Sequence, residues 1–167
     1  MKLKSFAGMR CSIAGALEMI GDKWTILLLR DLALGVHRYD DLRNSSGIPN
    51  ATLAARLKNL EAQGLTERVR YRDRPPRDEY RLTEKGRDFW TVTTALREWG
   101  DRWDVCGHGA PTVQVVDLDT KRELRLALVD PRTGRAVPRE RVCYRPGPGA
   151  DEAVTDLLDK LNKGANV

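Results

Sequence analysis

Residues 39–82 restrict the fold more than any other part of this chain. Between residues 48 and 60 the apolar side chains recur at helical spacing, so they form one stripe that must face a core. Pro49 or Asn50 suits the start of such a helix, and Gly64 suits the position just after its end. The pattern therefore predicts an amphipathic helix whose other face is turned away from the core.

That other face is short, polar or basic, and it carries no carboxylate before Glu61. An ordinary surface helix, the alternative interpretation, usually mixes both charge signs on its outer face. A recognition helix in the major groove meets base edges and phosphates, where carboxylates are unfavourable. Arg56 is the best candidate for reading a base. The residues expected to face DNA are Asn50, Ala51, Thr52 and Arg56 in the groove, with Arg43 and Lys58 at phosphates.

Further helices are expected before this one. Residues 40–43 begin the first helix of a helix-turn-helix, and residues 44–47 form its turn. Upstream, Ser12 is placed to cap a helix that restarts at Asp22, another N-cap residue. Residues 24–29 are apolar nearly all round, so we expect them to lie in the central buried helix of the domain.

After Leu65 the apolar period changes from helical to two, which predicts a half-buried strand. Residues 73–77 form a turn, because two consecutive prolines cannot continue a ladder. Residues 78–82 then return as the partner strand. A hairpin directly after a recognition helix is the wing of a winged helix.

Six arginines lie along this predicted wing, and their planar guanidinium groups match phosphate. The alternative is a solvated hairpin with internal ion pairs. That alternative suits Arg81 and Glu79 but explains the tip poorly. Contact with the DNA backbone or minor groove is therefore expected from Arg72, Arg74 and Arg77.

A second apolar series begins where the winged domain should end, after a helix start capped by Thr83. Its steps of three and four residues are those of a seam between packed helices. The alternative to a homodimer is that this apolar face packs onto its own domain. Both arrangements hold if the first helix and this one exchange contacts across a two-fold axis. A dimer would place two recognition helices about one DNA turn apart. The dimerisation residues expected are Leu17, Phe89, Val92, Leu96, Trp99 and Trp103.

Past residue 105 the character of the sequence changes. Residues 130–134 read as a turn, residues 146–149 break regular structure, and an amphipathic helix follows. We predict a DNA-binding domain over residues 9–105 and a small β-rich extension over residues 106–167, in an α+β fold. No internal repeat is expected. The strands expected in the extension are residues 112–116, 124–129 and 141–144.

The composition fits a DNA-binding protein but does not establish one. The net charge is +5, a modest excess that suits a polyanionic partner. No apolar run approaches the roughly 18 residues of a membrane span, and the first residues lack the apolar stretch of a signal peptide. Three widely spread cysteines do not form a disulfide framework, so a reducing cytoplasm is the expected location.

The histidines, cysteines and tryptophans of the sequence bear on metal, catalytic and ligand sites. Cys106, His108 and Cys143 supply three ligands where a structural zinc site wants four, so no metal is expected. The two histidines lie far apart, with no nucleophile motif and no glycine-rich phosphate loop, so neither enzyme activity nor a cofactor is expected. A receptor for a small apolar or aromatic molecule is more plausible than an enzyme, although simple core packing explains each aromatic residue taken singly. The pocket would be lined by Trp24, Trp90 and Trp99.

Taken together, these motifs resemble the HxlR-type transcriptional regulators, winged-helix relatives of MarR proteins. The resemblance covers residues 9–103 and implies a homodimer that binds double-stranded operator DNA. Asp22 departs from it, since the family more often has a glycine there. The matching segments include residues 17–25, 38–42, 53–57, 60–65, 75–80 and 82–86.

Cys11 carries an alternative mode of control. Members of this family often have a cysteine at this place, and in some it senses oxidants or electrophiles. A thiolate at a helix N-terminus is stabilised by the helix dipole, and Arg10 adds positive charge beside it. The inert alternative is an ordinary cysteine without a sensing role. The resemblance therefore leaves open regulation by a small ligand or by oxidation of Cys11.

Overall fold

The computed structural model describes residues 5–164, which form two compact units. The larger unit is Ala16–Leu126. The other joins the residues up to Gly15 to those from Ala127 onward. The described helices and the two-stranded antiparallel sheet confirm the α+β class.

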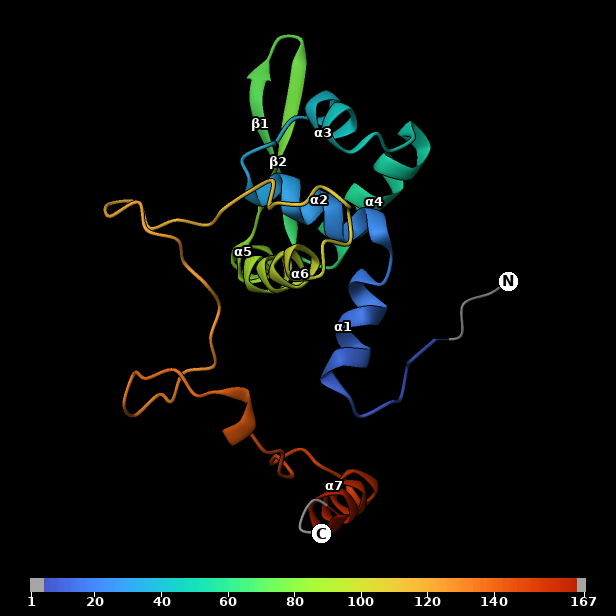
Figure 1. The fold of residues 1–167 in the computed structure, drawn as a ribbon. Helices are drawn as coiled ribbons and strands as arrows, with labels where there is room; N and C mark the ends of the chain where they lie inside the picture. The colour runs from blue at the N-terminus through green and yellow to red at the C-terminus, as the bar shows by residue number, and fades with distance from the viewer. Residues whose placement is uncertain (1–4, 165–167) are drawn as a thin grey trace. The chain divides into compact units, whose positions relative to one another are not determined.

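The larger unit contains six helices and a hairpin (Figure 1). Its first helix begins just before the unit itself, and each later element follows in chain order. The ribbon shows the hairpin extending beyond the helices at one end of this unit. The elements are α1 (Ser12–Ile20), α2 (Lys23–Ala33), α3 (Tyr39–Ser46), α4 (Asn50–Ala62), β1 (Thr66–Asp73), β2 (Pro76–Leu82), α5 (Glu84–Asp88) and α6 (Trp90–Arg102).

Leucines from α2, α3 and α4 form the core. The predicted stripe on α4 is buried, and α2 lies at the centre of the unit. However, α2 is not buried all round, because Ile26 and Leu27 are only half-buried and Leu34 just after it is 64% exposed. The fully buried members of the core include Leu28, Leu29, Leu32, Leu42, Ile48, Leu53, Leu57 and Leu60.

The helix-turn-helix has a longer first helix and a shorter turn than predicted. Residues 44–46 continue α3, and Gly47 ends it with a positive φ of 67°. The Ser46 hydroxyl donates to the Leu42 carbonyl oxygen at 2.6 Å and accepts from the Ile48 amide at 3.3 Å. These local bonds favour one more helical turn than a run of asparagine and serine suggests.

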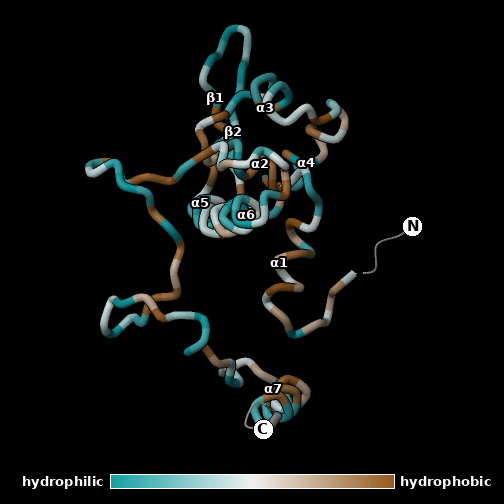
Figure 2. The backbone as a smooth tube through the Cα atoms, in the orientation of Figure 1, coloured by the Kyte–Doolittle hydropathy of each residue, from teal (hydrophilic) through white to brown (hydrophobic). Residues whose placement is uncertain are grey.

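The wing is confirmed as a hairpin, with a tighter tip than predicted. Asp73 pairs with Pro76, which leaves only Arg74 and Pro75 at the turn. The ladder is irregular between Arg70 and Arg72, as expected for an extra residue in one strand. The tube in Figure 2 is mostly hydrophilic along this hairpin and apolar near its base.

The helix predicted to begin at Thr83 is two helices. The Thr83 hydroxyl caps the first by accepting from the Gly86 amide at 3.2 Å. The break falls at Phe89, whose side chain packs against the core. Phe89 keeps helical backbone angles, with a φ of −64° and a ψ of −14°, and α6 starts directly after it at Trp90.

The extension does not form the predicted sheet. In the part of the chain described beyond α6, the strand-like segments supply only two isolated bridges, Val116 with Glu123 and Val129 with Ala136. Two short strands without a third strand or a packed face are marginally stable. Residues 139–141 form a 3-10 helix, and the predicted final helix is α7 (Glu152–Gly164).

Candidate nucleic-acid interface

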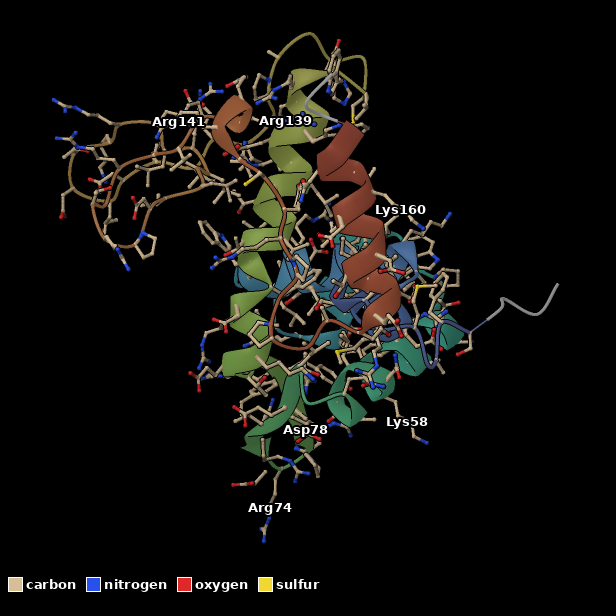
Figure 3. All side chains as sticks on the ribbon, turned by 90° about the horizontal axis from the view of Figure 1, so that it is seen from below. Lys58, Arg74, Asp78, Arg139, Arg141 and Lys160 are labelled. Atoms are coloured by element: carbon tan, nitrogen blue, oxygen red, sulfur yellow. The ribbon has the colours of Figure 1, made fainter. Side chains whose placement is uncertain are left out.

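The apolar stripe of α4 fixes which of its residues face outward. Leu53, Leu57 and Leu60 are buried, so the opposite side of the helix is left to solvent. Ala51 and Lys58 are exposed on that side, and Figure 3 shows Lys58 pointing away from the protein. This outward face carries no carboxylate, as the sequence predicts.

The start of α4 is tied to α3 by two polar contacts. The Tyr39 hydroxyl donates to the Asn50 carbonyl oxygen at 3.1 Å. Arg43 donates to the Asn50 side-chain oxygen at 3.4 Å and lies 3.7 Å from the Asp40 carboxylate. Asn50 and Arg43 are thus brought together at the first turn of α4, next to the half-buried Thr52.

Arg56 differs from the other predicted DNA-facing residues. Its Nε lies 3.0 Å from Oδ1 of Asp22, the residue that caps α2. The Nε–H does not point at the carboxylate, so the contact is an ion pair and not a hydrogen bond. Sequence reasoning gave Asp22 only a capping role, because no local pattern connects it to α4.

The arginines of the wing fall into two groups. Near the base, Arg68 pairs with Glu61 at 3.3 Å, Arg81 pairs with Glu79 at 2.6 Å, and Arg70 pairs with Asp78. The predicted pairing of Arg81 with Glu79 is therefore confirmed.

The second group lies at the tip. Arg72, Arg74 and Arg77 form no ion pair with any described carboxylate, and Arg72 instead donates to the Arg74 carbonyl oxygen at 3.0 Å. Figure 3 shows Arg74 projecting from the end of the hairpin. Arg72 and Arg77 lie opposite each other in the ladder, where like charges are unfavourable.

Tyr80 and Arg68 form a fixed contact at the base of the wing. The Arg68 guanidinium lies 5.4 Å from the centre of the Tyr80 ring. Burial raises the pKa of the Tyr80 phenol. The pKa of Arg68 is raised as well, first by Tyr80 and then by Glu61. Arg68 therefore stays charged and held against the domain.

The predicted dimerisation residues are mostly exposed. Leu17, Val92, Leu96, Trp99 and Trp103 show between 44% and 67% of their surface. Phe89 is the exception, since it packs against the core. The exposed members thus leave an apolar ridge on α6, with Leu17 exposed on α1.

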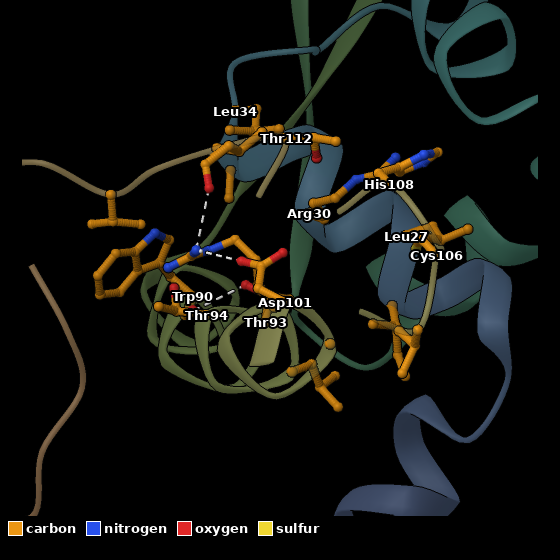
Figure 4. Close-up of a pocket in the computed structure, with 18 of the residues that line it drawn as sticks. Leu27, Arg30, Leu34, Trp90, Thr93, Thr94, Asp101, Cys106, His108 and Thr112 are labelled. Atoms are coloured by element: carbon orange, nitrogen blue, oxygen red, sulfur yellow. Dashed lines mark hydrogen bonds and ion pairs between the residues drawn. The ribbon is translucent and has the colours of Figure 1, made fainter. Parts of the chain in front are cut away.

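A cleft of about 420 Å³ lies within the larger unit, between α2, α6 and residues 104–115 (Figure 4). Of the three tryptophans predicted to line a pocket, only Trp90 lines it. Trp24 packs against the core, and Trp99 is 59% exposed. The cleft thus contains one of the three predicted tryptophans, together with residues of the half-buried face of α2 that the sequence analysis did not include.

The three cysteines are free and exposed, and Cys11 directly precedes α1. The neighbouring Arg10 lies 3.7 Å from Asp151. Within residues 5–164 no group of three or more histidine, cysteine, aspartate or glutamate side chains could hold a metal ion. No helix in that range is long and apolar enough to cross a membrane.

A helix-turn-helix followed directly by a two-stranded wing defines the class of winged-helix DNA-binding proteins. The model of the HxlR-like helix-turn-helix family matches residues 19–106. The chain belongs to that family, which confirms the predicted resemblance. Its relatives are transcriptional regulators and not enzymes.

Some relatives match far more of the chain than others. The uncharacterized HTH-type transcriptional regulator Rv3095 of Mycobacterium tuberculosis is 37% identical over 138 residues, 83% of this chain and 87% of its own. The crystal structure of PA1607 superimposes with a TM-score of 0.72 at 30% identity, over 86% of this chain and 100% of that one. The redox regulator HypR, in its reduced form, has a TM-score of 0.54 at 32% identity, over 58% of this chain and 98% of its own. The extension thus has counterparts in some relatives and not in others.

Proposed function

We propose that this chain is a homodimeric, sequence-specific DNA-binding regulator that acts in the cytoplasm. The observation that carries the proposal is the combination of an outward face on α4 without a carboxylate before Glu61 and a wing tip whose three arginines have no carboxylate partner within residues 5–164. Carboxylates neutralise the arginines at the wing base, while the tip keeps its charge for an external anion. DNA phosphate fits both surfaces at once.

Within this proposal each residue has a distinct role. Ala51, Thr52 and Asn50 face base edges, and Lys58 and Arg43 hold phosphates beside them. Arg72, Arg74 and Arg77 contact the backbone or the minor groove. A phosphate between Arg72 and Arg77 would offset the repulsion of two like charges paired across the ladder.

Arg56 remains the candidate for base readout, with Asp22 as its support. An arginine donates five N–H groups, and the Asp22 carboxylate lies 3.0 Å from the Nε of Arg56. The two terminal nitrogens stay available for the O6 and N7 atoms of a guanine. The ion pair would then orient the guanidinium before DNA arrives.

The dimer is supported by the exposed ridge on α6. A monomer that leaves Leu96, Trp99 and Trp103 about half exposed or more would carry an apolar surface that usually marks an interface. Two-fold pairing of this ridge would present two copies of α4 to a pseudo-palindromic operator.

The proposal is tested by fluorescence anisotropy of a labelled duplex from upstream of the protein's own gene, compared with random DNA of equal length over a series of salt concentrations. We expect tighter binding to the upstream duplex and a steep dependence on salt. Absence of binding to either duplex at low salt would overturn the proposal.

The cleft supports a small-molecule receptor as a second candidate function. Its volume lies in the range of ligand sites, and its charged lining residues already have partners within the chain. Arg30 binds Asp31 at 2.6 Å, Arg97 binds Asp101 at 2.9 Å, and the Asp104 carboxylate accepts from the His108 amide at 2.9 Å. A neutral apolar molecule suits such a lining better than an anion.

This candidate is tested by quenching of tryptophan fluorescence with nitrotoluene and, in parallel, with the nitrobenzoate anion. Saturable quenching by the neutral compound, lost in Trp90→Phe, is expected. Stronger binding of the anion, or equal quenching in the variant, would exclude the assignment.

Thiol control through Cys11 is the alternative mode of regulation. Its support is the free, exposed thiol just before α1, and HypR is described as a redox regulator. Oxidation should then release DNA from the wild type and not from Cys11→Ser. Equal responses of the two proteins would exclude this mode.

A further inference from the structure

The extension contains an internal repeat that sequence reading overlooked. Residues 116–124 read Val-Asp-Leu-Asp-Thr-Lys-Arg-Glu-Leu, and residues 129–137 read Val-Asp-Pro-Arg-Thr-Gly-Arg-Ala-Val. The valine, the aspartate, the threonine and the arginine recur at the same four positions. Both segments are short and the other positions differ, so the similarity is evident only once the two turns are compared.

The two segments form the same hydrogen-bonded turn. In the first, the Asp117 amide donates to the Arg122 carbonyl oxygen at 2.9 Å, and the Lys121 amide donates to the Asp117 carbonyl oxygen at 3.0 Å. In the second, Asp130, Gly134 and Arg135 make the same two bonds at 3.0 and 2.9 Å.

The recurring side chains also have equal roles. Asp117 and Asp130 each accept from the amide two residues later, at 3.1 and 2.8 Å. The hydroxyl groups of Thr120 and Thr133 each accept from an arginine amide at 3.4 Å. Asp117 also accepts from the Thr120 amide at 2.6 Å, and this bond, followed by those from the Thr120 side chain and the Asp119 amide, lowers the pKa of the Asp117 carboxyl.

The residue four positions after the recurring aspartate has a left-handed backbone in both segments. Lys121 has a φ of 57° and Gly134 has a φ of 65°. We name the two turns hairpin 1 (residues 116–124) and hairpin 2 (residues 129–137). The repeat is therefore structural as well as sequential.

Hairpin 1 is attached to α6 and is electrically balanced. Arg97 donates to the Val113 carbonyl oxygen at 3.2 Å, and the Leu126 amide donates to Glu98 at 2.9 Å. Both contacts lie within the larger unit and hold the two ends of the hairpin. Residues 116–125, the hairpin and the arginine directly after it, contain three cations and three carboxylates, and Arg125 pairs with Glu123 at 3.0 Å.

Hairpin 2 and the residues after it have a different charge balance. Residues 129–145 contain five arginines and only two carboxylates. Asp130 is used by the turn, and among the described residues no carboxylate pairs with any of the five. The arginine side chains are exposed, and Figure 3 labels two of them. The five are Arg132, Arg135, Arg139, Arg141 and Arg145.

We infer that the arm formed by residues 129–145, which is hairpin 2 with the arginines after it, is a second DNA-binding element that contacts phosphates flanking the operator. Hairpin 1, which precedes the arm in the chain, is the part attached to α6. Uncompensated arginines on a hydrogen-bonded turn fit a polyanion, as at the wing tip. The inference rests on the proposed function, because the winged helix would bring flanking DNA to the arm. It extends the contact beyond the DNA covered by α4 and the wing.

The test uses the full-length protein and two duplexes with the same operator. The short one spans the two half-sites, about 20 base pairs, and the long one adds about 15 base pairs on each side. The test variant replaces Arg132, Arg135 and Arg139 by glutamine. The matched control replaces Lys121, Arg122 and Arg125 by glutamine, which removes two cations from hairpin 1 and the one directly after it.

The wild type and the control should bind the long duplex with a steeper salt dependence than the short one. The test variant should lose this difference, since the slope falls by about 0.9 for each phosphate contact removed. Its affinity for the long duplex should fall about tenfold or more at moderate salt, with the short duplex unaffected.

Equal slopes for wild type and test variant on the long duplex would overturn the inference. Equal losses of affinity on the short and the long duplex would also overturn it. A changed oligomeric state in sedimentation, with no difference between the two duplex lengths, would overturn it too and would mark the arginines as a protein contact. If the wild type does not prefer its operator over random DNA, the proposed function fails instead. The comparison of lengths on random DNA then still decides the role of hairpin 2.

Discussion

The carboxylate of Asp22 connects the start of α2 to α4 through Arg56. Its Oδ1 accepts from the amides of Trp24 and Thr25, each at 3.1 Å, and lies 3.0 Å from the Arg56 Nε. Its Oδ2 accepts from the Thr25 hydroxyl at 2.5 Å. One side chain therefore sets both where the central helix begins and where a cation on α4 lies.

The capping role of Asp22 predicts a clear difference between two substitutions. Asp22→Ala removes the acceptor for two helix amides and should lower the free energy of unfolding by about 1 kcal/mol. Asp22→Asn keeps an N-cap acceptor and should stay within about 0.5 kcal/mol of wild type, because a partly exposed ion pair contributes little. Urea unfolding followed by circular dichroism measures both. Equal losses would mean that the charge, and not the cap, stabilises this junction.

The ion pair predicts coupling between Asp22 and Arg56 in DNA selectivity. If Asp22 orients the guanidinium for a base, Asp22→Asn and Arg56→Ala should each reduce the ratio of operator to random-DNA affinity. The double variant should then lose no more of this ratio than Arg56→Ala alone, because Asp22 no longer has a guanidinium to orient. Anisotropy titrations give the four ratios. Additive losses would show that the two residues act independently, and unchanged selectivity in Arg56→Ala would remove it from base readout.

Local chemistry explains why much of the fold could be predicted from the sequence. Asp22, Thr83 and Gly64 begin or end helices through bonds and backbone angles within a few residues, and the structure confirms all three. The Asp22–Arg56 pair could not be predicted in this way, because it depends on how α2 packs against α4. The same holds for the split at Phe89, which falls within a continuous helical pattern and which no local signal in the sequence marks.

In the candidate site, too, features set by local chemistry could be predicted from the sequence, and features set by packing could not. Alternation and turn chemistry placed the wing and its arginines, and the pairing of Arg81 with Glu79 followed from their spacing on one strand. The prediction of strands in the extension was wrong, because a strand needs a neighbouring strand that the sequence does not specify. Trp24 and Trp99 do not line the cleft, and helical spacing alone does not show which side of a tryptophan meets another element.

The wing tip gives a prediction that separates free from paired arginines. Arg74→Ala should weaken binding to operator and random DNA alike and reduce the salt slope by about one unit, because one phosphate contact is lost. Arg81→Ala is the matched control, since its guanidinium is already neutralised by Glu79 at 2.6 Å. It should leave the slope unchanged. A loss confined to the operator in Arg74→Ala would indicate base reading, and equal slopes for Arg74→Ala and wild type would place the tip outside the interface.

The contact between α5 and the end of α4 gives a prediction about stability. A Cβ added at Gly86 would overlap the Leu65 carbonyl oxygen and lie 3.0 Å from Cδ2 of Leu82. Because backbone cannot yield as a flexible side chain does, Gly86→Ala should lower the free energy of unfolding by about 1–3 kcal/mol. The effect should appear as a lower urea midpoint with an unchanged slope.

Gly100→Ala is the matched control, also in a helix but with open space around it. The added Cβ would meet only Cγ2 of Val105, at an ordinary 3.4 Å. Replacing a helical glycine by alanine then stabilises by up to about 1 kcal/mol. The two variants should therefore shift the midpoint in opposite directions. A midpoint for Gly86→Ala at or above that of wild type would show that α5 can move away from Leu65, and that the base of the wing is not fixed by this close approach.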